Sequence, residues 1–376
     1  MEFLYFTTQK IFPPNSGGLN VIYTFLKYFS KEVDLEIITP QCDETEIPIQ
    51  NHGRLNAVFL NRDNKIDKYL NPATFLKFWQ HISKHKPNTI IFHFPWYGWF
   101  FLICKAFFST RICLHQQNVE FLRFKRMGRW WWPALRVYEK WVCEGVDRVI
   151  AVTPVDREKF LKEFKLTPEK VLVAPYGFDS ERFPRSKPIS KKIHDELCDG
   201  KQQMILFFGG LDYLPNREAV TIIRERLAPY FSEKQLPAKF VVVGGSVPKE
   251  WSGVASGPLI EFLGHRENIK DYVYAADIVI APLISGSGIR TKIIEAIGCG
   301  KRVISTKVGA EGIDADVCGE LLQLVSDGDW EDFVRTTERT LYGRSTLSQT
   351  QDHHSFLKMY DGLAIAKRIA RILKEA

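Results

Sequence analysis

Apolar runs of strand length alternate along the chain with segments of helix length. In the first half the strand pattern fits Glu2–Thr7, Val33–Thr39, Leu55–Leu60, Asn88–His93, Arg111–His115, Asp147–Val152 and Lys170–Ala174. Helical runs such as Leu19–Ser30 and Pro72–His85 lie between them. Strands separated by helix-length segments predict βαβ units and a parallel sheet.

The same alternation restarts after a polar stretch at 185–203, which we interpret as a linker. The second series of strands comprises Gln202–Phe208, Phe240–Val243, Asp277–Ala281 and Arg302–Ser305. The pattern therefore predicts an α/β protein with two doubly wound, Rossmann-like domains. Their expected bounds are 1–184 and 204–352. Ligands of such sheets bind beyond the carboxyl ends of the strands, and the cleft between two facing domains is the expected site.

Composition narrows the class of protein further. Hydrophobic residues make up 45% of the 376 residues and charged residues 25%, which excludes a disordered, collagenous or coiled-coil chain. The seven cysteines are scattered without a CxxC pair, which favours reduced thiols over a disulfide scaffold. The N-terminal MEFLYFTTQK lacks the basic region of a signal peptide. We therefore expect a cytoplasmic protein.

The segment 281–313 carries the clearest candidate chemistry. A Gly/Ser loop, Ser285–Gly288, leads into a helix with Arg290, Lys292 and Glu295. Glycines let a ligand approach the backbone, and a helix start attracts anions. Two cations at that end oppose the helix dipole, so a bound diphosphate would explain them. Glu295 could accept hydrogen bonds from ribose hydroxyls. The alternative is a solvated charged face without a ligand.

Four stretches resemble one family, and their order and spacing along the chain match that family as well. The run GSGIRTKIIEAIGCGKRVIST resembles the donor-site signature of glycosyltransferase family 4. Residues 174–179 (APYGFD) resemble the segment that closes the first domain in that family. Residues 207–216 (FFGGLDYLPN) and 117–120 (QNVE) resemble elements of one branch. The resemblance extends over residues 3–375.

The resemblance implies a GT-B fold, in which a final helix at 353–376 returns to the first domain. It implies a retaining transferase that moves a sugar from a UDP- or GDP-sugar to a glycan or lipid-linked acceptor, as in surface polysaccharide biosynthesis. It also implies no cofactor and no essential metal.

Site residues follow from the same resemblance. Arg290 and Lys292 would neutralise the leaving diphosphate, and His115 is a further candidate for the catalytic site. The residues implied in donor binding are Gly17, Gly18, Gly209, Ser287, Gly288 and Glu295.

Three positions depart from the family pattern. Ser287 replaces a frequent Glu, which puts the identity of the donor sugar in doubt. Gly210 stands at a usual Arg position, so Arg290 and Lys292 would take over its charge. Gln117 stands where the branch has a His, which leaves either His115 or no histidine at the catalytic site.

Two rival functions remain open at this point. A nucleotide-sugar 2-epimerase of the same shape would turn over its substrate without an acceptor. The second rival is a glycan- or nucleotide-binding subunit that has lost its activity. Its best support is Ser287, which stands where the family often has a Glu.

The segment 121–136 (FLRFKRMGRWWWPALR) is basic and aromatic. It contains five cations and no acid, within a chain whose formal net charge is +7. Three consecutive Trp residues cannot share one face of a helix, so at least one is expected at the surface or in a cleft. This composition suits contact with anionic lipid headgroups, and hence a peripheral position on the inner membrane face. A solvated basic helix is the alternative, and no recognised nucleic-acid-binding module is present.

Overall fold

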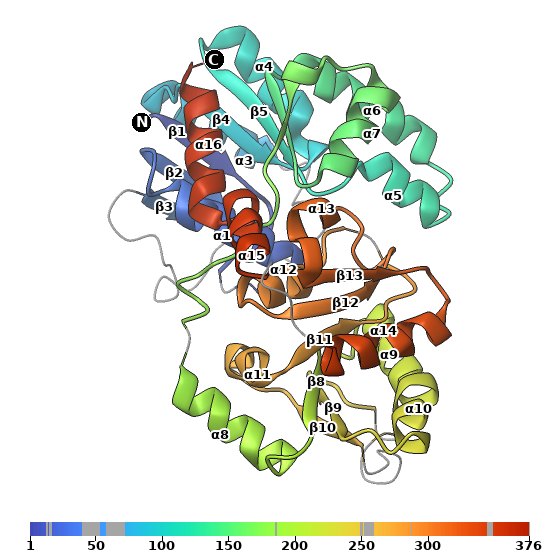
Figure 1. The fold of residues 1–376 in the computed structure, drawn as a ribbon. Helices are drawn as coiled ribbons and strands as arrows, with labels where there is room; N and C mark the ends of the chain where they lie inside the picture. Colours follow the sequence, from blue (N-terminus) through green and yellow to red (C-terminus); the bar gives the residue numbers. More distant parts are fainter. Residues whose placement is uncertain are drawn as a thin grey trace. The chain divides into compact units, whose positions relative to one another are not determined.

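The computed structural model describes residues 1–12, 14, 17–39, 53–57, 72–184, 186–248, 251, 259–286, 288–343 and 349–375. The chain forms two compact units, Met1–Gly177 with Gly362–Ala376, and Phe178–Asp361 (Figure 1). Each unit contains one parallel sheet with helices packed against it. The predicted α/β class with two doubly wound domains is therefore confirmed.

The first unit contains a seven-stranded sheet in the order β3-β2-β1-β4-β5-β6-β7. Its strands are β1 (Phe3–Phe6), β2 (Leu35–Thr39), β3 (Gly53–Ala57), β4 (Thr89–His93), β5 (Arg111–Gln116), β6 (Arg148–Ala151) and β7 (Val171–Val173). The direction of winding reverses between β1 and β4. Because ligands bind at such switch points, the carboxyl ends of these strands are where a site is expected.

Successive residues of β1 enter different cores on the two faces of this sheet. Phe3 and Tyr5 pack with α1 (Gly17–Phe29) and α16 (Gly362–Glu375), whereas Leu4 and Phe6 pack on the opposite face. Burial on both faces explains why these strands are continuous apolar runs. The helices of the opposite face are α3 (Pro72–His85), α4 (Gly98–Phe107), α5 (Glu120–Arg126), α6 (Trp132–Gly145) and α7 (Pro154–Phe164).

The last helix, α16, belongs to the first unit and packs beside α1 (Figure 1). The helix expected at 353–376 is thus shorter than expected, because residues 353–360 belong to α15 (Gln349–Tyr360) of the second unit. Two glycines meet where the chain leaves this unit and re-enters it. A Cβ on Gly177 would lie 2.5 Å from the Cα of Gly362. Only glycine therefore fits this approach of two backbone segments.

The bounds of the units differ from the domain bounds drawn from the sequence. The second unit begins at Phe178, whose buried ring packs so closely on Gly298 that a Cβ there would lie 2.2 Å away. The segment expected as a linker contains α8 (Lys187–Cys198), which packs against α11 (Ile269–Ala275). The polarity of 185–203 thus reflects one exposed helix face rather than an extended connection.

The second unit contains a six-stranded sheet in the order β10-β9-β8-β11-β12-β13. Its strands are β8 (Gln203–Phe208), β9 (Ala238–Val243), β10 (Ile260–Gly264), β11 (Ile278–Ala281), β12 (Arg302–Thr306) and β13 (Leu322–Val325). The remaining helices are α9 (Leu214–Ile222), α10 (Ala228–Glu233), α12 (Thr291–Gly298), α13 (Ala315–Cys318), α14 (Trp330–Tyr342) and α15 (Gln349–Tyr360).

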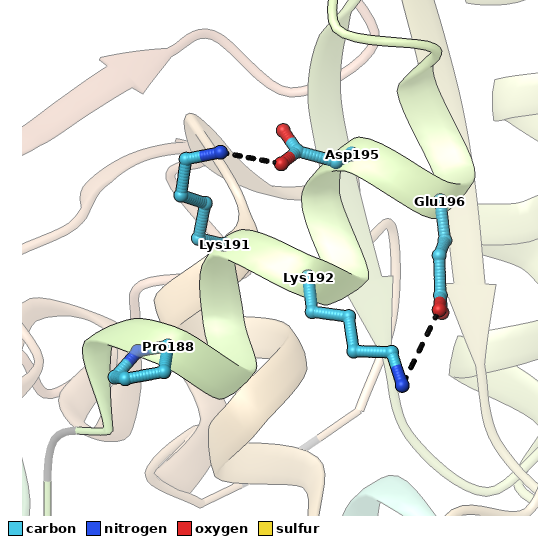
Figure 2. A pocket seen from close by; sticks show the side chains of 5 residues that line it. All are labelled: Pro188, Lys191, Lys192, Asp195 and Glu196. Atoms are coloured by element: carbon cyan, nitrogen blue, oxygen red, sulfur yellow. Dashed lines mark hydrogen bonds and ion pairs between the residues drawn. The ribbon is translucent and has the colours of Figure 1, made fainter.

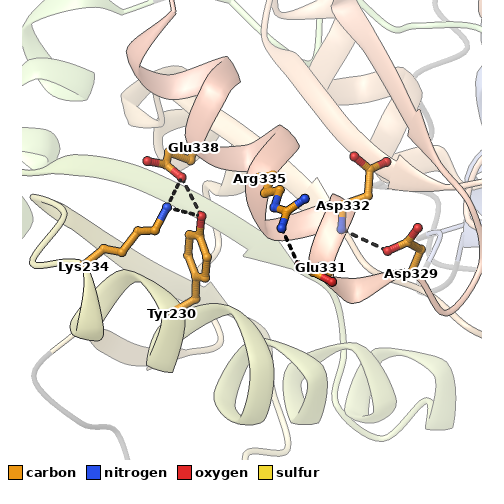
Figure 3. Close-up of polar contacts among 7 residues, drawn as sticks. All are labelled: Tyr230, Lys234, Asp329, Glu331, Asp332, Arg335 and Glu338. Atoms are coloured by element: carbon orange, nitrogen blue, oxygen red, sulfur yellow. Dashed lines mark hydrogen bonds and ion pairs between the residues drawn. The ribbon is translucent and has the colours of Figure 1, made fainter.

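Polar side chains join α10 to α14 on this unit (Figure 3). The hydroxyl of Tyr230 donates to Glu338 at 2.7 Å, and the ammonium of Lys234 lies 3.2 Å from the same carboxylate. At the start of α14, the side chain of Asp329 accepts a hydrogen bond from the backbone N–H of Asp332 at 3.0 Å. These contacts secure α10 and the start of α14, and no predicted site residue takes part in them.

Candidate functional site

The connection between β11 and α12 carries most of the predicted site residues of the second unit. Gly286 and Gly288 have φ angles of +109° and +81°, a region that favours glycine. Helix α12 then begins with Arg290 at its N-cap position and has no acid in its first turn. No carboxylate in the first turn therefore neutralises the positive end of the helix dipole.

Arg290 is buried and braces the glycine-containing loop. Its Nη1 donates to the carbonyl of Gly288 at 3.0 Å, and its Nη2 donates to the carbonyl of Ser285 at 3.2 Å. A Cβ on Gly286 would lie 2.5 Å from Nη2. Burial lowers the pKa of this guanidinium from its usual value. The loop conformation and the position of the cation thus depend on each other.

Lys292 is half-buried, and its ammonium group lies at the carboxyl end of β8. Its Nζ donates to Oδ1 of Asn216 at 2.8 Å and lies 4.2 Å from the centre of the Phe207 ring. Burial lowers the pKa of Lys292 to about 7, and the charge of Arg290 acts in the same direction. A Cβ on Gly209 would lie 2.8 Å from Nζ, so this glycine leaves room for the ammonium.

Glu295 lies one turn further along α12, with a buried side chain. Its carboxylate is 3.9 Å from the guanidinium of Arg182, which belongs to the same unit. The structure thus brings Arg290, Lys292 and Glu295 together on the first two turns of one helix, next to Gly209 and Gly288. The remaining donor-site candidate of this unit, Ser287, lies outside the described residues.

In the first unit, the predicted Gly17 and Gly18 form the exposed start of α1. The Nε2 of Gln117 donates to the carbonyl of Gly18 at 2.6 Å, and a Cβ on Gly18 would lie 3.0 Å from Oε1 of the same amide. Gln117 is the residue that stands at the family's histidine position. It therefore contacts Gly18 directly.

His115 lies on β5 and is fully buried beneath α1. Its Nδ1 is 2.9 Å from the hydroxyl of Tyr5, and its ring packs against Phe25. Burial lowers the pKa of His115 to about 4, so the ring is neutral near pH 7. These contacts are those of a core residue, and the catalytic role of His115 stays a prediction.

Two residues that the sequence reasoning missed belong to these sites. Asn216, at the start of α9, binds Lys292, and no spacing rule in the sequence distinguishes it. Glu139 is fully buried on α6 and accepts hydrogen bonds from the backbone N–H groups of Glu120 and Phe121, at 2.9 and 2.8 Å. Its carboxylate also accepts from Gln116 at 2.9 Å and so fixes the turn that carries Gln117.

A shallow depression on α8 does not resemble these sites (Figure 2). Its charged side chains pair with each other along the helix: Lys191 with Asp195 at 2.6 Å and Lys192 with Glu196 at 3.7 Å. Such exposed pairs at i and i+4 stabilise a helix slightly and give no reason to infer a ligand.

Two family descriptions match the chain and together cover parts of both units. Glycosyltransferase Family 4 matches residues 15–182, and Glycosyl transferases group 1 matches residues 202–342. The chain belongs to glycosyltransferase family 4. The resemblance seen in the motifs is therefore confirmed.

Individual relatives of this family 4 chain agree with the assignment. It is 26% identical over 239 residues to the phosphatidylinositol N-acetylglucosaminyltransferase GPI3 subunit of Saccharomyces cerevisiae, a match that covers 61% of this chain and 50% of that protein. The matched segment thus spans about half the length of this curated relative. A glycosyltransferase from Rickettsia africae gives a TM-score of 0.74 at 16% identity and covers 100% of this chain and 99% of its own.

Anabaena Alr3699/HepE, solved with UDP and glucose, gives a TM-score of 0.69 at 16% identity over 100% of both chains. These likenesses support the GT-B fold.

Within the described part of the family 4 chain, no group of three or more His, Cys, Asp or Glu side chains could hold a metal ion.

Replacing Glu139 by Gln tests whether the buried carboxylate fixes the β5–α5 turn. The amide presents an NH2 group to backbone donors, so at least one buried hydrogen bond is lost. We expect the free energy of unfolding to fall by about 1–3 kcal/mol, measured by urea denaturation. Glu144→Gln on the same helix is the control, because Glu144 is exposed and its pair with Lys140 at 3.6 Å contributes little. Equal losses in both variants would contradict this account.

Proposed function

We propose that this protein is a retaining glycosyltransferase that moves a sugar from a UDP- or GDP-sugar to a glycan or lipid-linked acceptor, in surface polysaccharide biosynthesis. The observation that carries the proposal is the pair of desolvated cations, Arg290 and Lys292, at the start of α12. Neighbouring like charges with lowered pKa values favour the binding of an anion between them. A nucleotide diphosphate supplies two negative groups of suitable spacing.

The other predicted residues fit parts of the same donor. Gly209 and Gly288 let phosphate oxygens approach the backbone, and Ser287 lies in the same loop sequence. The carboxylate of Glu295 accepts hydrogen bonds from ribose hydroxyls, since an ionised carboxylate only accepts. Gly17 and Gly18, at the start of α1, are proposed to bind the sugar–phosphate end.

The chemistry follows from where charge develops. Cleavage of the bond between the sugar and the phosphate leaves negative charge on the diphosphate. Fixed cations and helix N–H groups directed at that charge lower the barrier. We propose same-face attack by the acceptor, whose proton passes to the leaving phosphate, so that configuration is retained. Arg290 and Lys292 then perform the neutralisation for which other enzymes use a divalent metal.

The relatives support the two substrate classes. The Anabaena protein was solved with UDP, which favours a UDP-sugar as donor. The yeast relative is named for transfer of N-acetylglucosamine to phosphatidylinositol, which favours a lipid acceptor.

The double variant Arg290→Ala with Lys292→Ala tests the donor site. Each charge-assisted hydrogen bond contributes about 1.5–3 kcal/mol, so we expect UDP affinity to fall at least about 100-fold by calorimetry. The control is Arg266→Ala with Lys307→Ala, which removes two exposed cations from the same unit. Unchanged UDP affinity in the first variant, with its fold intact by circular dichroism, would remove the proposed site.

Proton NMR of a UDP-sugar with the enzyme in EDTA tests the mechanism. We expect slow release of free sugar that first appears in the donor's anomeric configuration, at a rate unaffected by Mg2+. Appearance of the inverted anomer would contradict retention, and dependence on Mg2+ would contradict the role given to the two cations. Formation of the C2 epimer of the intact nucleotide sugar would favour the epimerase instead. Binding without turnover, with or without added lipid acceptor, would favour a non-catalytic subunit.

The turn between α5 and α6 supports contact with a membrane surface. Trp130 is 87% exposed and Met127 is 54% exposed. The sequence predicts that at least one of the three consecutive Trp residues lies at the surface, and Trp130 is that residue. Arg126 and Arg129 beside them are exposed and, within the described part of the chain, form no ion pair. Exposed apolar side chains flanked by cations suit the interface of an anionic bilayer.

The other cations of 121–136 have protein partners. Arg123 pairs with Glu120 at 2.7 Å, Arg136 with Glu163 at 3.5 Å, and Lys125 lies 4.7 Å from the Trp132 ring centre. No described helix is both long and apolar enough to cross a bilayer. We therefore propose peripheral attachment to the cytoplasmic face of the membrane through Arg126–Trp130.

Vesicle cosedimentation tests this attachment. Each cation near an anionic surface contributes about 1 kcal/mol, so Arg126→Ser with Arg129→Ser should weaken partitioning onto phosphatidylglycerol vesicles roughly 30-fold. The charge-matched control is Lys191→Ser with Lys192→Ser on α8, whose side chains are equally exposed to solvent. Loss of binding in the control to the same extent would show a nonspecific charge effect and contradict the proposal.

A further inference from the structure

Asn216 is a buried amide at the start of α9, between the two elements that carry the cation site. Its Nδ2 donates to the carbonyl of Gly210 at 2.7 Å, and its Oδ1 accepts from Lys292 Nζ at 2.8 Å. The amide therefore ties the ammonium from α12 to the backbone that follows β8.

The orientation of this amide follows from the chemistry of its partners. An ammonium group only donates hydrogen bonds, and a backbone carbonyl only accepts them. The oxygen of Asn216 must therefore face Lys292, and its nitrogen must face Gly210. The amide cannot be flipped without losing both hydrogen bonds.

Glycines close the remaining sides around the ammonium. A Cβ on Gly209 would lie 2.7 Å from Nδ2 of Asn216 and 2.8 Å from Nζ of Lys292. A Cβ on Gly244 would lie 2.0 Å from the carbonyl oxygen of Gly209, so the backbone on that side cannot move away. The Phe207 ring, whose centre is 4.2 Å from Nζ, covers a further side, so the surrounding groups fix the position of the ammonium.

We propose that Asn216 is the positioning residue of the donor site: its amide holds the Lys292 ammonium at the carboxyl end of β8, where it meets the diphosphate of the nucleotide sugar. This inference rests on the proposed function, because only that function identifies the anion near the ammonium as a nucleotide diphosphate. Of the three N–H donors of Lys292, Asn216 occupies one and the Phe207 ring faces another side. The ammonium therefore retains donor capacity for a phosphate oxygen.

The hydrogen bond to Asn216 also influences the charge of Lys292. Burial lowers the pKa of this lysine to about 7, Arg290 acts in the same direction, and Glu295 opposes it. On the neighbouring elements, the carboxylate of Glu218 on α9 binds Ser285, and Asp212 lies beside Gly210. A diphosphate favours the charged amine, so binding above pH 7 requires uptake of a proton. Affinity is then constant below about pH 7 and falls above it, by up to tenfold per pH unit.

Calorimetric titration with UDP-glucose between pH 6 and 8.5 tests the role of Asn216. The phosphates of this probe do not titrate in that range, unlike those of UDP. In Asn216→Ala the ammonium loses its acceptor, so we expect the fall in affinity to begin at lower pH and the affinity at pH 8 to drop about tenfold or more. In the nearly isosteric Asn216→Asp, a carboxylate within 4 Å raises the lysine's pKa, and the fall should begin at least one pH unit higher.

Asn268→Ala is the matched control, since Asn268 is exposed on the same unit. It should reproduce the wild-type profile. Identical pH profiles for wild type, Asn216→Ala and Asn216→Asp would overturn the positioning role, because a merely structural amide does not move the profile.

NMR of reductively ¹³C-methylated protein separates this inference from the proposed function. The Lys292 signal, assigned with Lys292→Arg, should titrate near pH 7 in the wild type and at least one unit higher in Asn216→Asp. An unmoved midpoint overturns the positioning role whether or not a nucleotide binds. A shifted midpoint in a protein that binds neither UDP-glucose nor GDP-glucose would support the hold on Lys292 and contradict the donor assignment.

Discussion

The cost of desolvating two neighbouring cations constrains the whole site of the second unit. Arg290 and Lys292 lie at the positive end of α12, where the helix dipole and their mutual repulsion both disfavour them. The structure offsets this cost with neutral acceptors: carbonyls of Ser285 and Gly288 for the guanidinium, and the amide of Asn216 for the ammonium. These neutral acceptors orient the cations, while the charges of Glu311 and Glu295 act on Arg290 and Lys292 respectively and oppose the lowering of their pKa values.

How far the sequence predicts this fold depends on burial. Strands buried on both faces, such as β8 and β11, appear as continuous apolar runs and were found close to their true bounds. The edge strands β10 and β13 were missed. Four of the five residues of β10 are only half-buried, and the four-residue β13 has one half-buried and one exposed position. Helix α8 was missed for a related reason. Its exposed face is so polar that the segment resembled a linker.

The candidate site divides along similar lines. Arg290, Lys292 and Glu295 could be predicted as one cluster because they lie within a single short segment, at the start of one helix. Asn216 could not be found, because its contact with Lys292 joins residues 76 positions apart and requires the order of strands in the sheet. The first unit shows the opposite difficulty. The sequence predicts His115 from its residue type alone, and only the structure shows that its ring lies beneath α1, while Gln117 in the following turn reaches Gly18.

The ammonium of Lys292 constrains the residue at position 209, directly after β8. The resemblance places an arginine after the first strand of the second domain, and this chain has Gly210 there. The ammonium of Lys292 instead reaches the end of that strand from α12 and lies 2.8 Å from where a Cβ of Gly209 would be. A side chain at 209 would therefore displace this ammonium from its position beside Asn216, and the φ of +147° at Gly209 also favours glycine. The steric constraint thus applies to Gly209, one position before Gly210, where the resemblance places an arginine.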